Sequence, residues 1–329
     1  MPEHIVDPQV AIVVIGRNEG ARLVRCLNSV TAHAGRVVYV DSGSTDGSVA
    51  VARAAGAAVV QLDLSDPFTA ARARNAGIAA LRQAGTLPDY IQFVDGDCEV
   101  QPGWIAAGTA FLNGDPRAAV VSGRLRERFP QASVYNRLCD AEWNTPLGEA
   151  QACGGIALIR ATALVNLGGF NPALIAGEEP ELCFRMRQKG WLIWRIDCEM
   201  ALHDAAMMRF SQWWTRSRRG GYAAAEGVAL HGTGPDRLGV ATMRRAVVWG
   251  LVLPVATLLS AVFVTPWALS LLLAYPAQIV RLARRFGGTR FAWTQASFLV
   301  LGKFAEAAGI LEQRIRKLTG KPTGIIEYK

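Results

Sequence analysis

Residues 90–97 read YIQFVDGD, and this stretch decides the fold class. Its first five residues have the composition of a buried strand, and two carboxylates follow around a glycine. Similar short apolar runs occur at 10–15 (VAIVVI), 37–41 (VVYVD) and 57–61 (AAVVQ). Stretches with helical spacing lie between these runs, at 21–30, 48–55 and 70–84. This alternation predicts an α/β fold in which helices flank a mostly parallel central sheet.

Polar residues follow three of these predicted strands. Asn18 and Glu19 follow the first, Asp41 closes the second, and Asp95 and Asp97 end the fourth. In parallel sheets, ligands bind beyond the carboxyl ends of the strands. We therefore expect these side chains to line one site, the alternative being that strand ends are polar in any fold.

The pair Asp95 and Asp97 predicts a divalent metal site. Two carboxylates held close together repel one another unless a cation lies beside them. Mg²⁺ or Mn²⁺ binds one or two carboxylates and fills its shell with phosphate oxygens of the substrate. One D-x-D sequence is weak evidence alone, but a second acidic strand end, at Asp41, strengthens it.

The segment at 41–48, DSGSTDGS, predicts a tight turn into a helix. A helix N-terminus favours phosphate, but Asp41 would repel it, so this carboxylate suits a nucleobase N–H or a ribose hydroxyl. Ser44 or Asp46 can cap the helix, which is the purely structural interpretation. No G-x-G-x-x-G follows the first strand, which disfavours a dinucleotide-binding dehydrogenase.

Taken together, these segments resemble the family 2 glycosyltransferases, which have the GT-A nucleotide-sugar-binding fold. The resemblance runs through 10–19, 41–48, 73–77, 95–97, 154–155 and 177–190. It implies inverting transfer of a sugar from a nucleoside-diphosphate sugar, with a UDP-sugar expected, to an acceptor hydroxyl. It also implies that Asp41 contacts the nucleobase and that Arg74 lies near the nucleotide. The expected nucleotide-sugar ligands are Asn18, Glu19, Asp41, Ser44, Arg74, Asp95, Arg216 and Arg219; the expected metal ligands are Asp95, Asp97 and His203; Gly154 and Gly155 are expected to bind the acceptor.

The segment at 177–185, GEEPELCFR, resembles the acidic motif of this family. The second acidic residue, normally Asp, is the usual catalytic base, and Glu179 stands there. Because Glu is longer by one methylene, Glu178 stays an alternative base. One base suffices when a metal stabilises the departing diphosphate. Acidic residues at a helix N-terminus also complement the helix dipole, and this structural role explains Glu181 better than Glu179.

Two further features concern the phosphates and the product. The family counterpart of His203 lies near the diphosphate, although a lone histidine also has structural uses. The guanidinium groups of Arg216 and Arg219 suit phosphate oxygens or lipid headgroups. Processive relatives carry Q-x-x-R-W here, whereas this chain reads QWWTR at 212–216. We therefore expect addition of one sugar rather than polymerisation.

The rear of the chain predicts a membrane-associated region. Residues 246–280 contain no charged side chain, and arginines flank the run on both sides. Positive flanks and interior prolines predict a hairpin that turns near residues 265–267 and has both ends in the cytoplasm. A re-entrant pair and a buried soluble helical pair are the alternatives. A basic amphipathic helix over about 291–318 is expected to lie on anionic lipid or to pack on the catalytic domain. The expected domains are a catalytic domain at 1–222, a linker at 223–245 and the membrane-associated region at 246–329.

Charge and cysteine content agree with this division. The net charge is −4 over residues 1–204 and +12 over residues 205–329. The six cysteines form no C-x-x-C pair, which disfavours a zinc site and fits a reducing cytoplasm. We expect an enzyme at the cytoplasmic face of a bacterial inner membrane, acting on a polyprenyl-diphosphate-linked glycan in lipid-linked glycan or exopolysaccharide synthesis. A sugar nucleotidyltransferase and an inactive nucleotide-sugar-binding membrane scaffold are the rivals, and a nucleic-acid partner is not expected.

Overall fold

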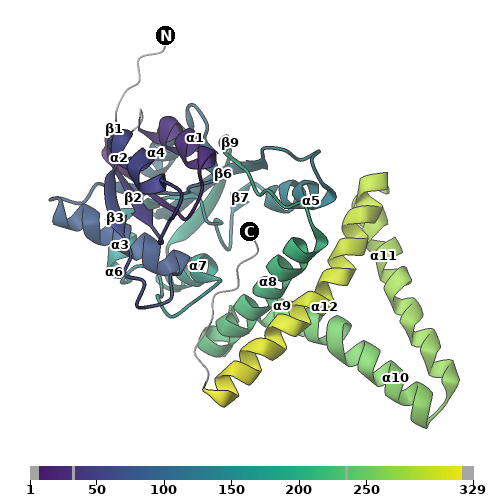
Figure 1. The fold of residues 1–329 in the computed structure, drawn as a ribbon. Coiled ribbons are helices and arrows are strands. Elements are labelled where there is room, and N and C mark those ends of the chain that lie inside the picture. Colours follow the sequence, from purple (N-terminus) through teal and green to yellow (C-terminus); the bar gives the residue numbers. More distant parts are fainter. Residues whose placement is uncertain (1–6, 32–33, 234–235, 321–329) are drawn as a thin grey trace. The chain divides into compact units, whose positions relative to one another are not determined.

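The computed structural model describes residues 7–31, 34–233 and 236–320 (Figure 1). It divides the chain into two compact units, residues 1–208 and residues 209–329. The predicted boundary at residue 222 therefore lies inside the second unit, and the predicted linker at 223–245 is largely helical. The reason is that residues just before and after 222 are small or aromatic and pack within the helical unit.

The first unit is built on a mixed sheet with the strand order β3-β2-β1-β4-β8-β6-β9-β5, to which β7 adds by pairing with β9. The first four strands in this order are mutually parallel, and β6 is parallel to β9. The strands are β1 (Asp7–Gly16), β2 (Ala34–Asp41), β3 (Ala58–Gln61), β4 (Tyr90–Asp95), β5 (Cys98–Val100), β6 (Ala118–Glu127), β7 (Gly148–Glu149), β8 (Ala157–Arg160) and β9 (Leu192–His203).

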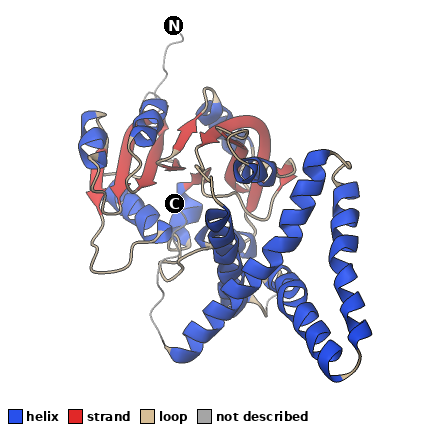
Figure 2. Ribbon diagram, turned by 45° about the vertical axis from the view of Figure 1, so that its right-hand side comes forward, coloured by secondary structure: helices blue, strands red, loops and turns tan. Residues whose placement is uncertain are grey.

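Helices cover both faces of this sheet, as the sequence predicts (Figure 2). They are α1 (Ala21–Val30), α2 (Ser48–Ala54), α3 (Ala70–Gln83), α4 (Trp104–Gly114), α5 (Val134–Trp143), α6 (Ala161–Asn166) and α7 (Glu178–Gln188). The first three coincide with the predicted helical stretches to within one residue. The α/β fold class with flanking helices is confirmed.

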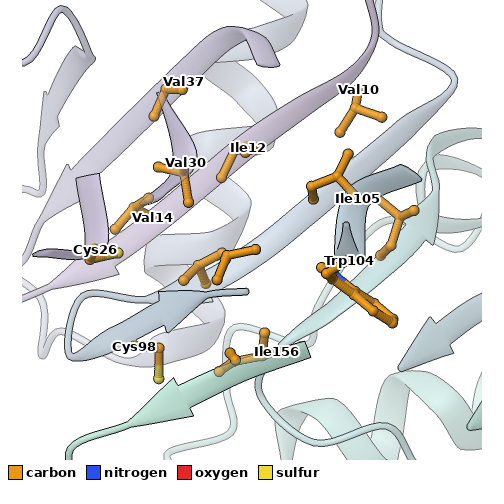
Figure 3. Packing of buried hydrophobic residues seen from close by; sticks show 14 of the residues in the cluster. Val10, Ile12, Val14, Cys26, Val30, Val37, Cys98, Trp104, Ile105 and Ile156 are labelled. Atoms are coloured by element: carbon orange, nitrogen blue, oxygen red, sulfur yellow. The ribbon is translucent and has the colours of Figure 1, made fainter. Parts of the chain in front are cut away.

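Apolar side chains of β1 point alternately to the two faces of the sheet, so helices must cover both faces. Val10, Ile12 and Val14 join the cluster under α1 and α4, part of which is drawn in Figure 3. The intervening residues join a second cluster on the opposite face. Burying an aliphatic side chain contributes about 1.5–3 kcal/mol, so the two clusters fix the strand in place.

One glycine lets α3 approach the sheet closely. A Cβ on Gly77 would lie 2.3 Å from Cγ1 of Val13 on β1, so a side chain there would push the helix outward. Thr69 caps the same helix by accepting a hydrogen bond from the backbone N–H of Arg72. The cap and the close approach together fix the position of Arg74, which lies on the first turns of α3.

The second unit is helical. It comprises α8 (Phe210–His231), α9 (Val240–Val247), the π-helical turn η1 (Val248–Val252), α10 (Leu253–Phe263), the 3₁₀ helix η2 (Pro266–Leu273), α11 (Ala274–Arg285) and α12 (Arg290–Thr319). Glycines mark its tightest contacts. A Cβ on Gly309 of α12 would lie 1.9 Å from the carbonyl oxygen of Arg218 on α8, and one on Gly221 would lie 2.0 Å from that of Glu306. Small residues at helix crossings allow this close packing.

The chain turns back between α10 and η2, as the predicted hairpin requires (Figure 1). The hydroxyl of Thr265 accepts a hydrogen bond from the backbone N–H of Trp267 and starts the second arm. Among the described residues, Val240–Phe263 is long and apolar enough to cross a membrane, and only 11% of its most apolar window is buried. Phe263 and Trp267 at the turn are 79% and 84% exposed. The alternative of a buried helical pair is therefore wrong for the unit as described.

The predicted amphipathic helix is α12. Its buried face is made mainly of small residues such as Ala305 and Gly309, which pack against α8 and η1. The larger apolar residues that the sequence places in a stripe, among them Leu311, Ile315 and Leu318, lie on the exposed side. The helix thus packs mainly through small residues, together with Val300 and Ile310, and leaves Leu311, Ile315 and Leu318 uncovered.

Candidate functional site

The loops after β1 and β2 are held together by hydrogen bonds. The backbone N–H of Asn18 donates to Oγ of Ser44 (2.9 Å), and the side-chain oxygen of Asn18 accepts from the backbone N–H of Thr45 (2.7 Å). Asp46 accepts from the backbone N–H of Gly20 (2.9 Å). Asn18 adopts a positive φ of 55°, which asparagine tolerates better than most residues. The predicted neighbours Asn18 and Ser44 are therefore in contact.

Asp41 is fully buried at the end of β2. One carboxylate oxygen accepts hydrogen bonds from the backbone N–H groups of Gly43 (3.0 Å) and Ser44 (2.9 Å). The other accepts from the hydroxyl of Tyr39 (3.1 Å). The structure thus gives Asp41 a role in shaping the turn, and its expected contact with a nucleobase stays a prediction.

Arg74 connects two acidic segments. Its guanidinium donates to Oε1 of Glu178 at 2.7 Å and to Oδ1 of Asp95 at 3.1 Å. It also donates to the carbonyl oxygen of Gly155. The Arg74 side chain is only 3% exposed, whereas that of Asp95 is 34% exposed. Asp95 therefore presents an open carboxylate whose position is fixed from behind by a buried cation.

Gly155 makes this arrangement possible. A Cβ at this position would lie 3.0 Å from Oδ2 of Asp95 and 3.1 Å from Nη2 of Arg74. Gly154 precedes it with a positive φ of 82°. The glycine pair thus brings backbone against the ion pair, while its predicted contact with an acceptor stays a prediction.

Asp97 lies beside His203, as predicted. Oδ2 of Asp97 is 3.1 Å from Nε2 of His203, and Cys98 donates to Oδ1 of Asp97 at 3.4 Å. Strand pairing explains this contact, because Cys98 on β5 is directly opposite His203 on β9. The imidazole stacks on Trp143, with ring centroids 4.6 Å apart. The side chains of Asp97 and His203 are largely buried.

The structure brings together part of the predicted metal set. Asp97, Cys98 and His203 place ligand atoms within 4.8 Å of one another, whereas Asp95 pairs with Arg74, and its role as a metal ligand stays a prediction. The predicted repulsion between Asp95 and Asp97 is relieved by separate partners. Two neighbouring ligands around an octahedral ion at 2.0–2.1 Å lie about 3 Å apart. The separation of Asp97 and His203 matches that spacing, so these two residues fit a hard divalent ion.

Glu179 and Glu178 contact different partners, since the carboxylate of Glu178 pairs with Arg74. Oε1 of Glu179 accepts hydrogen bonds from the backbone N–H of Cys153 (2.6 Å) and from the thiols of Cys153 and Cys183 (3.1 Å each). Glu179 is 7% exposed, and burial raises the pKa of its carboxyl group above the usual range. Glu181, by contrast, pairs with Arg185 on the same helix, in agreement with a structural role.

The remaining predicted ligands contribute less to this group. Glu19 lies just before α1 and pairs at 2.8 Å with Arg22 on the first turn of that helix. Arg216 and Arg219 lie on α8 in the second unit, so their contribution to a site in the first unit stays a prediction. Sequence reasoning missed Cys98, Cys153 and Cys183, which contact the acidic residues. Only the position of Cys98 directly after the D-x-D sequence signalled such a contact.

Comparison with known proteins agrees with this arrangement. Residues 11–151 match the family model described as glycosyl transferase family 2. The front part of the chain is therefore similar to the family 2 glycosyltransferases. The matched segment includes β1, β2, β4 and the acidic strand ends, while His203 and the glutamates of α7 lie beyond it.

Similar proteins support the same fold. The chain is 25% identical over 197 residues to glycosyltransferase AglE of Haloferax volcanii, covering 56% of this chain and 63% of that protein. It is 25% identical over 241 residues to the pre-mycofactocin glycosyltransferase of Mycobacterium tuberculosis, covering 69% and 48%. The chain thus spans less than two thirds of these relatives. The mannosyltransferase PcManGT from Pyrobaculum calidifontis, solved with GDP-Man and Mn²⁺, superposes with a TM-score of 0.64 at 20% identity, covering 94% of this chain and 89% of that one. This likeness shows that the fold is GT-A.

Proposed function

We propose that the protein is an inverting, metal-dependent glycosyltransferase that transfers one sugar from a nucleoside-diphosphate sugar to a hydroxyl of a lipid-linked glycan. The observation that carries this proposal is one edge of a GT-A sheet where Asp95 and Asp97 end a central strand. Arg74 holds the first carboxylate, and His203 contacts the second. The match to the family 2 glycosyltransferase model covers these strand ends.

Glu179 is the proposed base, which removes the proton from the acceptor hydroxyl. A general base works best when its pKa is near the working pH. Burial raises the pKa of Glu179 in that direction. Glu178 is less suited because its carboxylate forms an ion pair with the buried Arg74. An inverting transfer needs a base, which the start of α7 supplies, and it needs no general acid.

Asp97 and His203 are the proposed metal ligands. A bound divalent ion supplies charge stabilisation to the departing diphosphate. Asp95 presents its exposed carboxylate toward the donor from the same strand end, and Arg74 keeps it oriented. The structural relative PcManGT was solved with Mn²⁺ and GDP-Man, so guanosine donors are tested beside the expected uridine donors.

The helical unit is the proposed membrane attachment. Its turn exposes Phe263 and Trp267, and the rear of the chain carries the positive charge. Apolar side chains with flanking arginines suit a bilayer whose cytoplasmic leaflet is anionic. A polyprenyl-diphosphate-linked glycan at the cytoplasmic face of a bacterial inner membrane is the acceptor that such an attachment favours.

A donor screen with the detergent-solubilised full chain tests the chemistry. UDP- and GDP-sugars are supplied with a polyprenyl-diphosphate glycan and Mn²⁺, and glycolipid product and released nucleoside diphosphate are measured. We expect equimolar product and diphosphate, both lost in EDTA. Release of pyrophosphate from a nucleoside triphosphate and sugar phosphate would instead identify a nucleotidyltransferase. Donor binding without turnover for every acceptor would identify a scaffold.

Flotation with liposomes of anionic phospholipid tests the attachment. Replacing both Phe263 and Trp267 by Ser removes exposed apolar side chains without disturbing a buried contact. We expect weaker flotation of this variant. The matched control is Leu64→Ser, which removes an exposed leucine from the first unit. Equal flotation of wild type and the double variant would contradict the role of the turn.

A further inference from the structure

Two cysteine thiols and one carboxylate converge beside α7. Glu179 and Cys183 are one helical turn apart on this helix, and Cys153 lies on the loop before β8. The two sulfur atoms are 3.7 Å apart, and each lies 3.1 Å from Oε1 of Glu179. Glu179 and Cys183 are buried, whereas Cys153 is partly exposed. The group is therefore enclosed on the helix side and accessible from the loop side.

The distances match the edges of a metal tetrahedron. With Zn–S bonds of about 2.3 Å, two sulfur ligands at the tetrahedral angle lie about 3.8 Å apart. The sulfur atoms already have this separation. With a Zn–O bond of about 2.0–2.2 Å, a sulfur and an oxygen ligand lie about 3.5–3.7 Å apart. The two sulfur–oxygen distances are shorter than this value, and a carboxylate movement of roughly half an ångström would lengthen both to it.

We propose that Cys153, Glu179 and Cys183 form a Zn²⁺ site that inhibits the enzyme by engaging its base. Two thiolates and one carboxylate supply three ligands, and water from the loop side supplies the fourth. A carboxylate bound to Zn²⁺ is unable to accept the proton of an acceptor hydroxyl. This consequence rests on the proposed function, whereas binding of the metal does not.

Ligand type separates this site from the one at Asp97. Thiolates select Zn²⁺, whereas carboxylate and water suit Mg²⁺ and Mn²⁺. The Asp97 group contains a single thiol, that of Cys98, which donates a hydrogen bond to the carboxylate. The Cys153 group contains two thiols facing each other. The hydrogen-bond contact with Cys183 raises the pKa of the Cys153 thiol, so metal binding must release protons and weaken at low pH.

Cobalt substitution tests the binding directly. The full chain is reduced with a phosphine, freed of metal and titrated with Co²⁺, whose thiolate charge-transfer absorption reports sulfur ligation. Zn²⁺ is then added to displace it. We expect one equivalent per chain in the wild type. Loss of an outer-shell partner already costs about 10–100-fold in metal affinity, so Cys153→Ser and Cys183→Ser should each cost at least that much.

Two control variants locate the site. Cys198→Ser removes a partly exposed thiol on β9, and Cys98→Ser removes the thiol of the Asp97 group. Both should keep the charge-transfer absorption. The proposal is overturned if this absorption is absent from the wild type, if it disappears with Cys98→Ser, or if it survives both Cys153→Ser and Cys183→Ser. A Cys153–Cys183 disulfide found by mass spectrometry in the reduced protein would also overturn it.

Inhibition is measured separately, in transfer assays with saturating Mg²⁺ and increasing Zn²⁺. Each variant is normalised to its own activity without Zn²⁺. We expect inhibition of wild type and Cys198→Ser, with at least a 10-fold higher inhibitory concentration for Cys183→Ser. Zn²⁺ binding without inhibition would keep the metal site and refute Glu179 as the base. Absence of any transfer activity would refute the proposed function while the cobalt result stands.

Discussion

Neutralising Glu179 should mainly reduce activity, whereas neutralising Glu178 should mainly reduce stability. The change to glutamine keeps the size of the side chain and removes its charge. At Glu179 the amide oxygen still accepts the hydrogen bond from the backbone N–H of Cys153, but the group is unable to accept a proton at neutral pH. Loss of a general base costs about 10²–10⁴-fold in rate. We therefore expect kcat to fall by that factor while donor affinity changes little.

The stability of Glu179→Gln should not decrease. Burial raises the folded-state pKa of Glu179, which means that the folded protein disfavours its charged form. This penalty is present in full when the pH is above the raised pKa, decreases as the pH falls through it, and is gone below the ordinary pKa of the unfolded state. Because a neutral amide does not carry the penalty, Glu179→Gln should be at least as stable as wild type at pH 7. The difference should narrow as the solution is acidified.

Glu178→Gln should lose stability instead. The lost interaction is a 2.7 Å ion pair with Arg74. The Glu178 side chain is 12% exposed and the Arg74 side chain is 3% exposed. A hydrogen bond to a charged group contributes about 1.5–3 kcal/mol. Since Asp95 still pairs with the guanidinium, the full cost of an orphaned buried charge does not arise. A unit of this size changes its melting temperature by about 2–4 °C per kcal/mol, which gives a decrease of about 3–12 °C.

Calorimetry and single-turnover assays on the two variants decide between these assignments. The expected result is a stable, nearly inactive Glu179→Gln and a less stable Glu178→Gln whose remaining turnover is higher. Glu181→Gln serves as a third variant, because its partner is Arg185 on its own helix. The reasoning is refuted if Glu178→Gln loses turnover at unchanged stability while Glu179→Gln stays near wild type. The base would then be Glu178.

Three further outcomes follow from named contacts. Asp97→Asn should abolish metal-dependent transfer and weaken donor binding, and full activity of this variant in EDTA would contradict the metal site. Cys183→Ala removes a thiol hydrogen bond that lowers the pKa of Glu179, so the acid limb of the kcat–pH profile should move to higher pH; an unmoved limb would disconnect Glu179 from catalysis. Gly309→Ala places a Cβ against the backbone of α8 and should destabilise the helical unit by at least about 1–3 kcal/mol, measured by thermal unfolding in detergent. Gly220→Ala, which meets no atom within 4 Å, should stabilise α8 by about 0.5–1 kcal/mol, and equal effects of the two substitutions would contradict the packing argument.

Local sequence patterns predict the fold well where a segment's partners are nearby in the chain. The helix at Ala21–Val30 is predicted without error because its apolar spacing and the strand before it are both local. The predicted boundary at 222 differs from the division after residue 208 because no local signal separates α8 from the sheet. Small residues of α8 make close contacts with α12, which lies about 90 residues later in the chain.

The site illustrates the same limit. The strand ends predict which acidic residues gather, since parallel strands deliver their carboxyl ends to one edge. The pattern of strands does not predict their partners, and only the family resemblance groups His203 with Asp97. Arg74 comes from a helix between the strands, and His203 reaches Asp97 through an antiparallel pairing over 106 residues of sequence separation. The repulsion between Asp95 and Asp97 is therefore a poor guide to metal binding.

Each of these acidic groups has a cation or hydrogen-bond donor beside it, and this arrangement explains how several carboxylates fold close together. Asp95 and Glu178 share one guanidinium, Asp97 faces an imidazole, and Glu179 faces two thiols and a backbone N–H. Only the imidazole and the thiols are also metal ligands. Asp97 and Glu179 are thus the carboxylates that have further metal-ligand types beside them. Softness of the ion decides between the two positions, so hard and soft cations are expected to have opposite effects on one active site.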